Sequence, residues 1–523
     1  MLLALLGGMA FAMVTTAVQQ SPTIDEPVYV GAGEVYAQQH SLRYNPEHPP
    51  LAKLLMAAGL AFDDARLDPA YPGDQTQLGR HLLYETGNNP FRLMLLARLP
   101  IILLTLAFGL VVYGFARDLA GAWGGVVALA LYAFSPDVIA HGSLATLDVA
   151  TAGLLLTTFW MLWRSRKRPR LYLPLAGVAL GAALATRMSA LPAVPLVLLL
   201  SLLSPAVVAK PARWWRDLGL RILAAIGVGL IATAVVWLVY LAVDPRLRWV
   251  APAGLPHPGG LTGLAVDLLP FPKAYRDGML IQFQFESRSF NGFLLGRAYR
   301  GALWYYQPVA LTIKTPLGML ALWLAGAVTM LVQPALRRAA PYLLLPAAVL
   351  FAVAMTGARD YGTRYVIFMP IFGAVVAGTV VLIRVRWAWI ATAALVGFVA
   401  VSSALTFPYY LPYSNEAFGG TAKTHLNLHD SNVDWGQDLG RLGTRLRDKY
   451  PGQPVWLVYK GAGVPGYYGI DGRNPLAVPA DQVHGLLVVS DSSVALAKGP
   501  LKALIDTSTE IDSVGYSITI YRR

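Results

Sequence analysis

Apolar runs with few charges recur along the first four-fifths of the chain. A helix needs about 20 mostly apolar residues to cross the hydrocarbon core of a bilayer. About eleven runs approach this length, so we expect an α-helical polytopic membrane protein with about eleven transmembrane helices. The predicted spans are residues 1–18, 92–116, 121–136, 145–163, 171–186, 188–207, 218–243, 308–333, 340–356, 362–383 and 386–406.

Basic residues recur at every second boundary between these runs. If eleven spans are present, all of the basic stretches lie on one side of the membrane, as the positive-inside rule requires. The N-terminus is then cytoplasmic and the C-terminus external. The stretches are "ARD" (116–118), "RSRKRPR" (164–170), "KPARWWRD" (210–217), "QPALRR" (333–338) and "RVRW" (384–387).

The long polar segments fall on the opposite, external side. Residues 1–406 form the predicted transmembrane domain, with external loops at 19–91 and 244–307, and residues 407–523 follow it as a tail. The tail alternates short β-like runs ("PVWLVYK", "GLLVVS", "YSITIYRR") with an amphipathic helix near "DLGRLGTRLRDKY". This alternation predicts a small external α/β domain.

Composition supports a membrane protein and narrows its chemistry. The 523 residues are 56% hydrophobic and only 14% charged, whereas soluble domains are about 25% charged. The chain has no cysteine, so disulfides and thiolate chemistry are excluded. The net charge of +13 arises in the short loops between apolar runs, so it records orientation in the membrane and does not indicate a nucleic-acid partner.

The first external loop carries the strongest candidate chemistry. Asp25 and Glu26 follow the first span closely, and if this segment is extended, only one of the two carboxylates can face a shared site. Further on, the prolines of "NPEHPPLAKLL" favour the start of a helix. That helix, "LAKLLMAAGLAF", is apolar but too short to span, so it lies in the interface or re-enters the membrane. Such a loop would bring Asp25, His48 and Lys53 together near a lipid head group.

Several motifs together resemble glycosyltransferase family 39, which includes the protein O-mannosyltransferases and aminoarabinose transferase-like enzymes. The Asp-Glu pair after the first span and "HPPLAK" are the most specific. The others are "RLP" (98–100), "SPDVIAHGSLATLD" (135–148), "LLGRAYRGALWYYQPVALTIKTP" (294–316), "YGTRYVIFMP" (361–370) and "HDSNVDWGQDLGRL" (429–442).

The resemblance implies a GT-C membrane fold and an inverting transfer of a sugar from a polyprenyl-phosphate carrier to an acceptor hydroxyl. The acceptor would be a protein or a glycolipid, and the site would lie on the periplasmic or external side of a bacterial inner membrane. Two alternatives have no chemistry: a polyprenyl-lipid transporter or flippase, and a non-catalytic protein that binds lipid-linked sugar. Transporters often show internal repeats and polar residues near the bilayer midplane; here no such repeat is seen and the polar residues gather at external helix ends.

The resemblance and the positions of the charges suggest roles for single residues. Asp25 is the expected base, and Glu26 orients its neighbours. Cations that stabilise the leaving phosphate are expected at external helix ends, where basic residues run against the positive-inside bias. Arg187 and Arg364, the latter with Tyr365, meet this description. Lys53 is a weaker candidate, whose alternative role is to anchor the re-entrant helix.

Four further residues are expected to support the site. Arg98 lies inside an apolar run and needs an acidic partner, for which Glu26 is the candidate. Asp148 either begins a helix, where the dipole favours a carboxylate, or contacts the donor sugar or an arginine. His48 and His141 are structural, hydrogen-bonded residues in one interpretation and metal ligands in the other. No ligand spacing supports a metal site, so we expect no metal, although some GT-C enzymes use a divalent cation.

Overall fold

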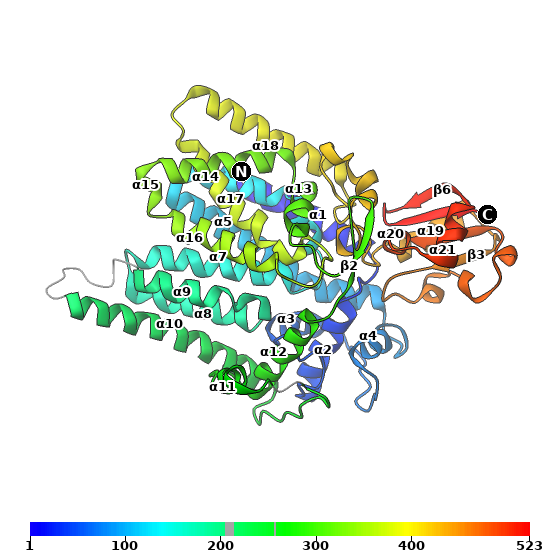
Figure 1. Cartoon of the computed structure of the whole chain (residues 1–523), viewed down its shortest axis with the longest axis horizontal. Coiled ribbons are helices and arrows are strands. Elements are labelled where there is room, and N and C mark those ends of the chain that lie inside the picture. The colour runs from blue at the N-terminus through cyan, green and yellow to red at the C-terminus, as the bar shows by residue number, and fades with distance from the viewer. Residues whose placement is uncertain (204–213, 256–257) are drawn as a thin grey trace.

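The computed structural model describes residues 1–203, 214–255 and 258–523. A body of long helices carries a small β-sheet domain at one end (Figure 1). The helices are α1 (Leu2–Gln19), α2 (Glu26–Gln39), α3 (Leu51–Leu60), α4 (Gln75–Tyr84), α5 (Pro90–Ala133), α6 (Pro136–Gly142), α7 (Asp148–Ser165), α8 (Pro169–Leu184), α9 (Ala193–Leu203), α10 (Trp214–Val243), α11 (Gly260–Asp267), α12 (Lys273–Glu286), α13 (Tyr306–Lys314), α14 (Leu317–Val332), α15 (Pro334–Arg337), α16 (Ala340–Ala354), α17 (Phe368–Ala377), α18 (Arg386–Thr406), α19 (Leu439–Lys449), α20 (Asp491–Ala495) and α21 (Gly499–Asp506). The strands are β1 (Asn291–Leu294), β2 (Arg297–Arg300), β3 (Val455–Val458), β4 (Gly472–Arg473), β5 (Leu486–Ser490), β6 (Thr509–Val514) and β7 (Ile518–Arg522).

The predicted count of eleven spans is wrong when judged by the length and apolarity of the helices. Each predicted run forms helix, but within the described residues only 4 helices are long and apolar enough to cross a membrane. They are α1, α5, residues 217–243 of α10, and α18; α13 and α14, bent by 116° between them, would make a fifth as one broken span. The remaining runs are mostly shorter apolar helices of 10–17 residues. The C-terminal end of the predicted span 188–207 lies outside the described residues.

Helix α5 explains part of the difference between the predicted and the observed number of spans. Its 44 residues include Gly121 at φ 76°, a left-handed conformation that a residue with a β-carbon rarely adopts. The chain folds back at this point, since Tyr132 Oη donates to the carbonyl of Thr105 (2.7 Å). Two predicted spans, 92–116 and 121–136, are therefore the two arms of one element.

The basic stretches gather at the end of the helical body that lies opposite the sheet (Figure 1). Arg164 Nε lies 3.1 Å from Asp118 Oδ2, which joins two of these stretches. Gln333 Nε2 donates to the carbonyl of Leu382 (3.0 Å), which brings two more close together. The stretch at 210–217 begins outside the described residues. Helices α2, α3 and α4 and the C-terminal sheet occupy the other end.

The predicted β-runs and amphipathic helix of the tail are all present. Its five-stranded mixed sheet has the order β4-β3-β5-β7-β6, in which β3 pairs with β4 and β5 in parallel and β7 is antiparallel to β5 and β6. The alternation of apolar side chains packs one face of β5 and β7 against Leu439 and Leu442 of α19. The opposite face packs against Leu504 of α21. The carboxyl ends of β3 and β5 therefore lie side by side, where loops can reach a common site.

Backbone hydrogen bonds join the tail to the first loop, residues 19–91. Ser21 N donates to the carbonyl of Gln437 (2.9 Å), and Ile24 N donates to the carbonyl of Trp435 (3.0 Å). Gly440 N donates in turn to Ser21 Oγ (2.8 Å). The segment directly before the acidic pair is thus held by the tail.

Candidate active site

The acidic pair lies at the start of α2, where the chain passes from an irregular segment into a helix. Asp25 is the N-cap and Glu26 the first helical residue, followed by Pro27, a residue well suited to the first turn. The segment after the pair is therefore helical and not extended. The two side chains nevertheless diverge, and each pairs with a different arginine.

Glu26 forms a buried anchor with Arg98, as expected for a charge inside an apolar run. Arg98 Nε and Nη2 donate to the two carboxylate oxygens at 2.7 and 2.6 Å. Thr23 N (2.9 Å) and Ala145 N (2.7 Å) also donate to this carboxylate. Burial opposes ionisation of Glu26, but the charge and hydrogen bonds of Arg98 together with these amides hold its pKa below the ordinary value. Arg98 further donates to backbone carbonyls at the end of α1, those of Ala17, Gln20 and Ser21.

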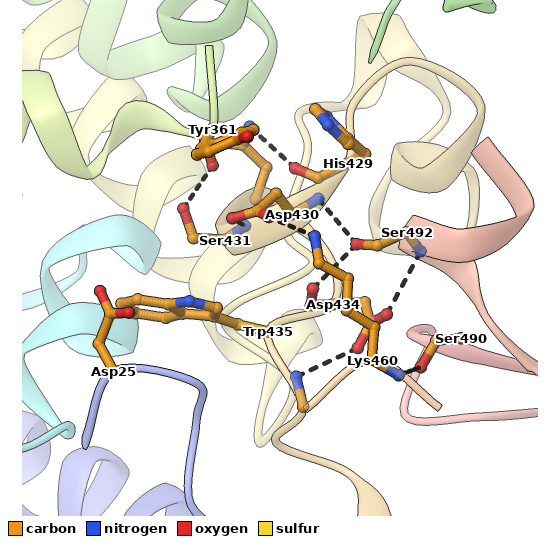
Figure 2. A network of polar contacts seen from close by, with 12 residues as sticks. Asp25, Tyr361, His429, Asp430, Ser431, Asp434, Trp435, Lys460, Ser490 and Ser492 are labelled. Carbon is orange, nitrogen blue, oxygen red and sulfur yellow. Dashed lines mark hydrogen bonds and ion pairs between the residues drawn. The ribbon is translucent and has the colours of Figure 1, made fainter. Parts of the chain in front are cut away.

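Asp25 instead faces a cavity. Arg364 Nη1 donates to Asp25 Oδ2 (2.6 Å), and the Asp25 side chain keeps 27% of its surface exposed. Tyr29 Oη is a second, longer donor to the same oxygen (3.5 Å). The guanidinium of Arg364 lies 4.4 Å from the centre of the Trp435 ring, and Figure 2 shows Asp25 beside that ring. The Asp25 carboxylate is therefore paired but open on one side.

Two adjoining cavities meet at Arg364. One, which we call the polar cavity, has a volume of about 430 Å³ and is lined by Asp25, Tyr361, Asp430 and Lys460 among others. The second, the apolar cavity, has a volume of about 440 Å³ and runs between side chains of α7, α16 and α17. The two share a set of lining residues: His48, Gln282, Arg359, Arg364 and Tyr365. Their junction is thus rich in cations and lies between a polar and an apolar space.

Arg187 and Asp148 form an ion pair in the apolar cavity. Asp148 is the first residue of α7, so both interpretations of this carboxylate hold: it begins a helix and it pairs with an arginine. The Arg187 guanidinium lies 5.5 Å from the centre of the Tyr365 ring. The ring thus lies between Arg187 and Arg364, whose guanidinium is 5.0 Å from it.

Arg359 was missed by the sequence prediction. It lines both cavities, and its Nη2 lies 2.6 Å from Glu286 Oε1. Its guanidinium is 5.8 Å from the centre of the Tyr365 ring. The signal that would have found it is the one that selected Arg364: a basic residue in a segment predicted to be external, five positions earlier in the chain.

Lys53 does not line either cavity and has the contacts of an anchor. Its ammonium donates to Tyr36 Oη (2.8 Å), to the carbonyl and side chain of Asn45 (2.9 and 3.0 Å) and to the carbonyl of His48 (2.7 Å). These bonds hold α3 to the loop before it. Of its two interpretations, the contacts match the anchor and not the phosphate ligand.

The two histidines lie in different places. His48 lines both cavities, and burial, together with the nearby charges of Arg187 and Lys53, keeps its pKa well below the ordinary value, so the ring is neutral. His141 is buried in α6 with its ring 6.1 Å from that of Trp435. Within the described residues, neither ring nitrogen of His141 has a hydrogen-bond partner, and no group of three His, Cys, Asp or Glu side chains could hold a metal ion.

A comparison with protein families gives a match over part of the chain. Residues 92–265 match the model of the dolichyl-phosphate-mannose-protein mannosyltransferase family. This segment includes Arg98, Asp148 and Arg187. The match confirms the resemblance predicted from the sequence and identifies the protein as a glycosyltransferase that is similar to this family over the matched segment. No curated protein matches the chain.

Solved structures give weaker likenesses. The ArnT protein of Cupriavidus metallidurans bound to undecaprenyl phosphate is 13% identical, with a TM-score of 0.48 over 99% of this chain and 97% of that one. The Archaeoglobus fulgidus oligosaccharyltransferase tethered with an acceptor peptide is 13% identical, with a TM-score of 0.42 over 86% of this chain and 57% of that one. Because both TM-scores are below 0.5, we base no conclusion on these likenesses.

Proposed function

We propose that this protein is a GT-C membrane glycosyltransferase that moves a sugar from a polyprenyl-phosphate carrier to an acceptor hydroxyl, with inversion at the anomeric carbon. The observation that carries the proposal is the junction of the two cavities, where Arg359, Arg364 and Tyr365 adjoin both an apolar and a polar space. The carrier's lipid tail suits the apolar cavity, its phosphate suits the arginines, and the sugar and acceptor suit the polar cavity.

Asp25 is the base in this proposal. As the acceptor oxygen bonds to the anomeric carbon, the bond from that carbon to the phosphate oxygen breaks, and the hydroxyl proton passes to Asp25. Polyprenyl phosphate leaves with the bonding electrons. Arg364 contacts Asp25 and adjoins the apolar cavity, so its guanidinium can stabilise the charge that develops on the phosphate. Arg359 and Arg187 would share this task, since planar guanidinium groups pair well with phosphate oxygens.

The remaining candidates would support this chemistry without performing it. Glu26 and Arg98 would fix the first loop relative to the membrane helices, and Asp148 would hold Arg187. His48, neutral and at the junction, would line the donor path. Lys53 would hold α3, and His141 would pack beneath Trp435. No step in this mechanism needs a divalent cation.

We also propose that the transfer takes place on the periplasmic or external side of a bacterial inner membrane, with a cytoplasmic N-terminus. Support comes from the basic stretches, which gather at the end of the helical body opposite the sheet of the tail (Figure 1). Positive charge favours the cytoplasmic side. The acceptor, a protein or a glycolipid, is the part of this proposal that rests on the family alone.

A transfer assay in membranes tests the proposed function. Labelled polyprenyl-phosphate hexoses would be supplied to the wild type, to Asp25→Asn and to Asp64→Asn, which changes an exposed carboxylate of the same loop. We expect label to move into protein or glycolipid with the wild type and Asp64→Asn, and not with Asp25→Asn. Transfer that survives in Asp25→Asn would remove Asp25 as the base. Donor binding without transfer in the wild type would favour a carrier or flippase.

A further inference from the structure

The short helix α11, in the segment between α10 and α12, exposes an apolar face. Leu261 and Leu264 of α11 and Leu268 directly after it are 85%, 54% and 72% exposed. Residues three and four positions apart share one side of a helix, so these three form a single surface, which we call the leucine face. Val266, on the opposite side, is only 8% exposed and packs into the core of the helical body. A contiguous apolar face of this kind marks contact with a membrane or with another protein.

The chain around α11 lies beside the last turns of α10 and not beyond them (Figure 1). Trp237 Nε1 of α10 donates to the carbonyl of Pro270 (2.9 Å). Thr233, Trp237 and Asp267 also line a common cavity of about 640 Å³. At 1.5 Å per residue, Trp237 lies about 9 Å before Val243, the last residue of α10. After it leaves α10, the chain therefore turns back along that helix.

The level of Trp237 on α10 is a membrane boundary. The spanning segment Asp217–Val243 has 27 residues and is about 40 Å long, whereas the hydrocarbon core is about 30 Å thick. The last turns of α10 therefore extend into the head groups, and tryptophan is enriched at this depth. Leu230 and Leu238 of the same helix are exposed, as expected for a surface that faces lipid. The leucine face lies beside this surface and continues it.

The cations near α11 already have acidic partners. Lys273 Nζ lies 2.6 Å from Asp277 Oδ2, and Arg276 Nη1 lies 3.8 Å from Asp267 Oδ1. Attraction to anionic head groups is therefore not the main force that would hold this segment at a membrane. The exposed leucines supply an apolar contact, which is the interaction that holds an interfacial helix in the acyl boundary.

We propose that α11 is an interfacial helix whose leucine face lies in the membrane leaflet at the C-terminal end of α10. In the orientation proposed above, this is the outer leaflet. The partner of the leucine face is thus the lipid bilayer, although the sequence predicts residues 244–307 to be an external loop.

This contact has a consequence for the apolar cavity. Helix α12 begins a few residues after α11, and its other end carries Phe283 and Glu286, which line the apolar cavity. Glu286 is also the partner of Arg359. An interfacial α11 would therefore tie one wall of the apolar cavity to the leaflet.

The absence of cysteine from the sequence allows a direct test by site-directed spin labelling. A nitroxide would be attached to Leu261→Cys, Leu264→Cys or Leu268→Cys of the full chain in phosphatidylcholine nanodiscs. Electron paramagnetic resonance would then measure collisions with oxygen, which concentrates in lipid, and with a water-soluble nickel chelate. We expect all three labels to favour oxygen, as should a label at Leu238→Cys. A label at Leu476→Cys, an exposed position of the tail, should favour nickel.

Two other patterns of collision would overturn the inference. Labels on α11 that favour nickel, as at Leu476→Cys, would show that the leucine face is in water. Labels that collide with neither reagent would show that protein covers the face, from a second copy or from another part of this chain. The oxygen preference should be the same in nanodiscs that contain phosphatidylglycerol, and a preference that appears only there would contradict an apolar contact.

A charged variant tests whether the leucines hold the helix in the leaflet. Leu261→Glu/Leu264→Glu places two carboxylates where lipid is expected, which is costly, so a label at Leu268→Cys should gain nickel collisions. The matched variant Leu261→Phe/Leu264→Phe keeps the face apolar and should leave that label unchanged. Equal collisions in both variants would overturn the role of the leucine face. The labels report position without any transfer reaction, so a failure of the proposed function would not change them.

Discussion

Asp25 and Glu26 are adjacent in the chain and each pairs with an arginine, but the two pairs lie in regions that differ in their access to water. The Glu26 and Arg98 side chains are almost fully buried, with exposed fractions of 0% and 1%. The Asp25 and Arg364 side chains keep 27% and 9% of their surface exposed and border a cavity. A carboxylate whose oxygens are all occupied by donors cannot take a proton from a substrate, whereas one with an open side can.

The two pairs also differ in the loss of stability that is expected when one partner is removed. Removing one partner of a fully buried pair leaves an uncompensated charge away from water, and the protein pays for it in stability. A half-open pair can recruit water or a ligand when a partner is lost. We therefore expect the buried pair to matter for folding and the open pair to matter for transfer.

The largest expected effect is on stability. Glu26→Gln leaves the Arg98 guanidinium buried without a counter-charge and should lower the free energy of unfolding by about 3–5 kcal/mol, measured by thermal unfolding in detergent. Glu26→Gln combined with Arg98→Met removes both charges and should recover part of this loss. A single variant as stable as the wild type would contradict a structural role for the pair.

Asp25→Asn should affect transfer strongly and stability little, in contrast to Glu26→Gln. Transfer should fall by about 10²–10⁴-fold, because a positioned base is lost, while the free energy of unfolding should change by no more than about 1 kcal/mol. Rates would be taken from the membrane assay and stability from the same unfolding measurement. A loss of stability as large as that of Glu26→Gln would show that the two carboxylates do not differ as proposed.

The pKa of His429, a buried residue of the tail, gives a prediction for the pH dependence of stability. Burial and the nearby charge of Lys460 lower its pKa to about 4, against the opposing charge of Asp430. Because the unfolded chain binds this proton at higher pH than the folded protein does, stability should be full above the ordinary histidine pKa of about 6.5 and should fall as the pH drops toward 4, with a loss of about 2 kcal/mol at pH 5.

The matched variant is His429→Phe. A phenyl ring keeps the packing against Phe293 and Tyr361, each 6.1 Å from His429, and cannot be protonated. The wild-type stability minus that of the variant should therefore decrease by about 2 kcal/mol as the pH falls from 7 to 5. A difference that stays constant over this range would contradict a lowered pKa of His429 in the folded protein.

The smallest expected effect comes from exchanging arginine for lysine in each pair. Arg364→Lys keeps the charge but loses the planar fork, so the donor KM should rise by about tenfold while stability is retained. Arg98→Lys should instead lower stability, because the bonds of Arg98 to Glu26 and to the end of α1 cannot all be made by an ammonium. Equal effects of the two substitutions on donor KM and on stability would contradict the proposed difference between the two pairs.

The sequence was sufficient for much of this arrangement. Apolar periodicity located the helices, and the cost of a lone charge in an apolar run led from Arg98 to Glu26. The bias against external cations selected Arg187 and Arg364. The span count failed because length along the chain does not reveal a reversal at Gly121 or a bend such as that between α13 and α14.

The remaining parts of the site depend on tertiary contacts that no local pattern records. Arg359 resembles any basic residue near a helix end until its proximity to Tyr365 is known. Asp430 and Lys460 lie far along the chain from Asp25, and only the pairing of β3 with β5 and the bonds of the tail to the first loop bring them to the same cavity. Sequence periodicity predicts single helices and strands, whereas the cavity depends on how these elements pack against one another.

The bonds between the tail and the first loop have a consequence for biogenesis. Ser21 Oγ accepts from Gly440 N, and the two residues are 419 positions apart. At about 5–20 residues per second, a ribosome needs roughly 20–80 s to cover that distance. During this interval the first loop lacks the tail residues that bond to Ser21 and Ile24. The polar cavity, which Asp25 lines together with Asp430 and Lys460 of the tail, can therefore form only after the tail has been made.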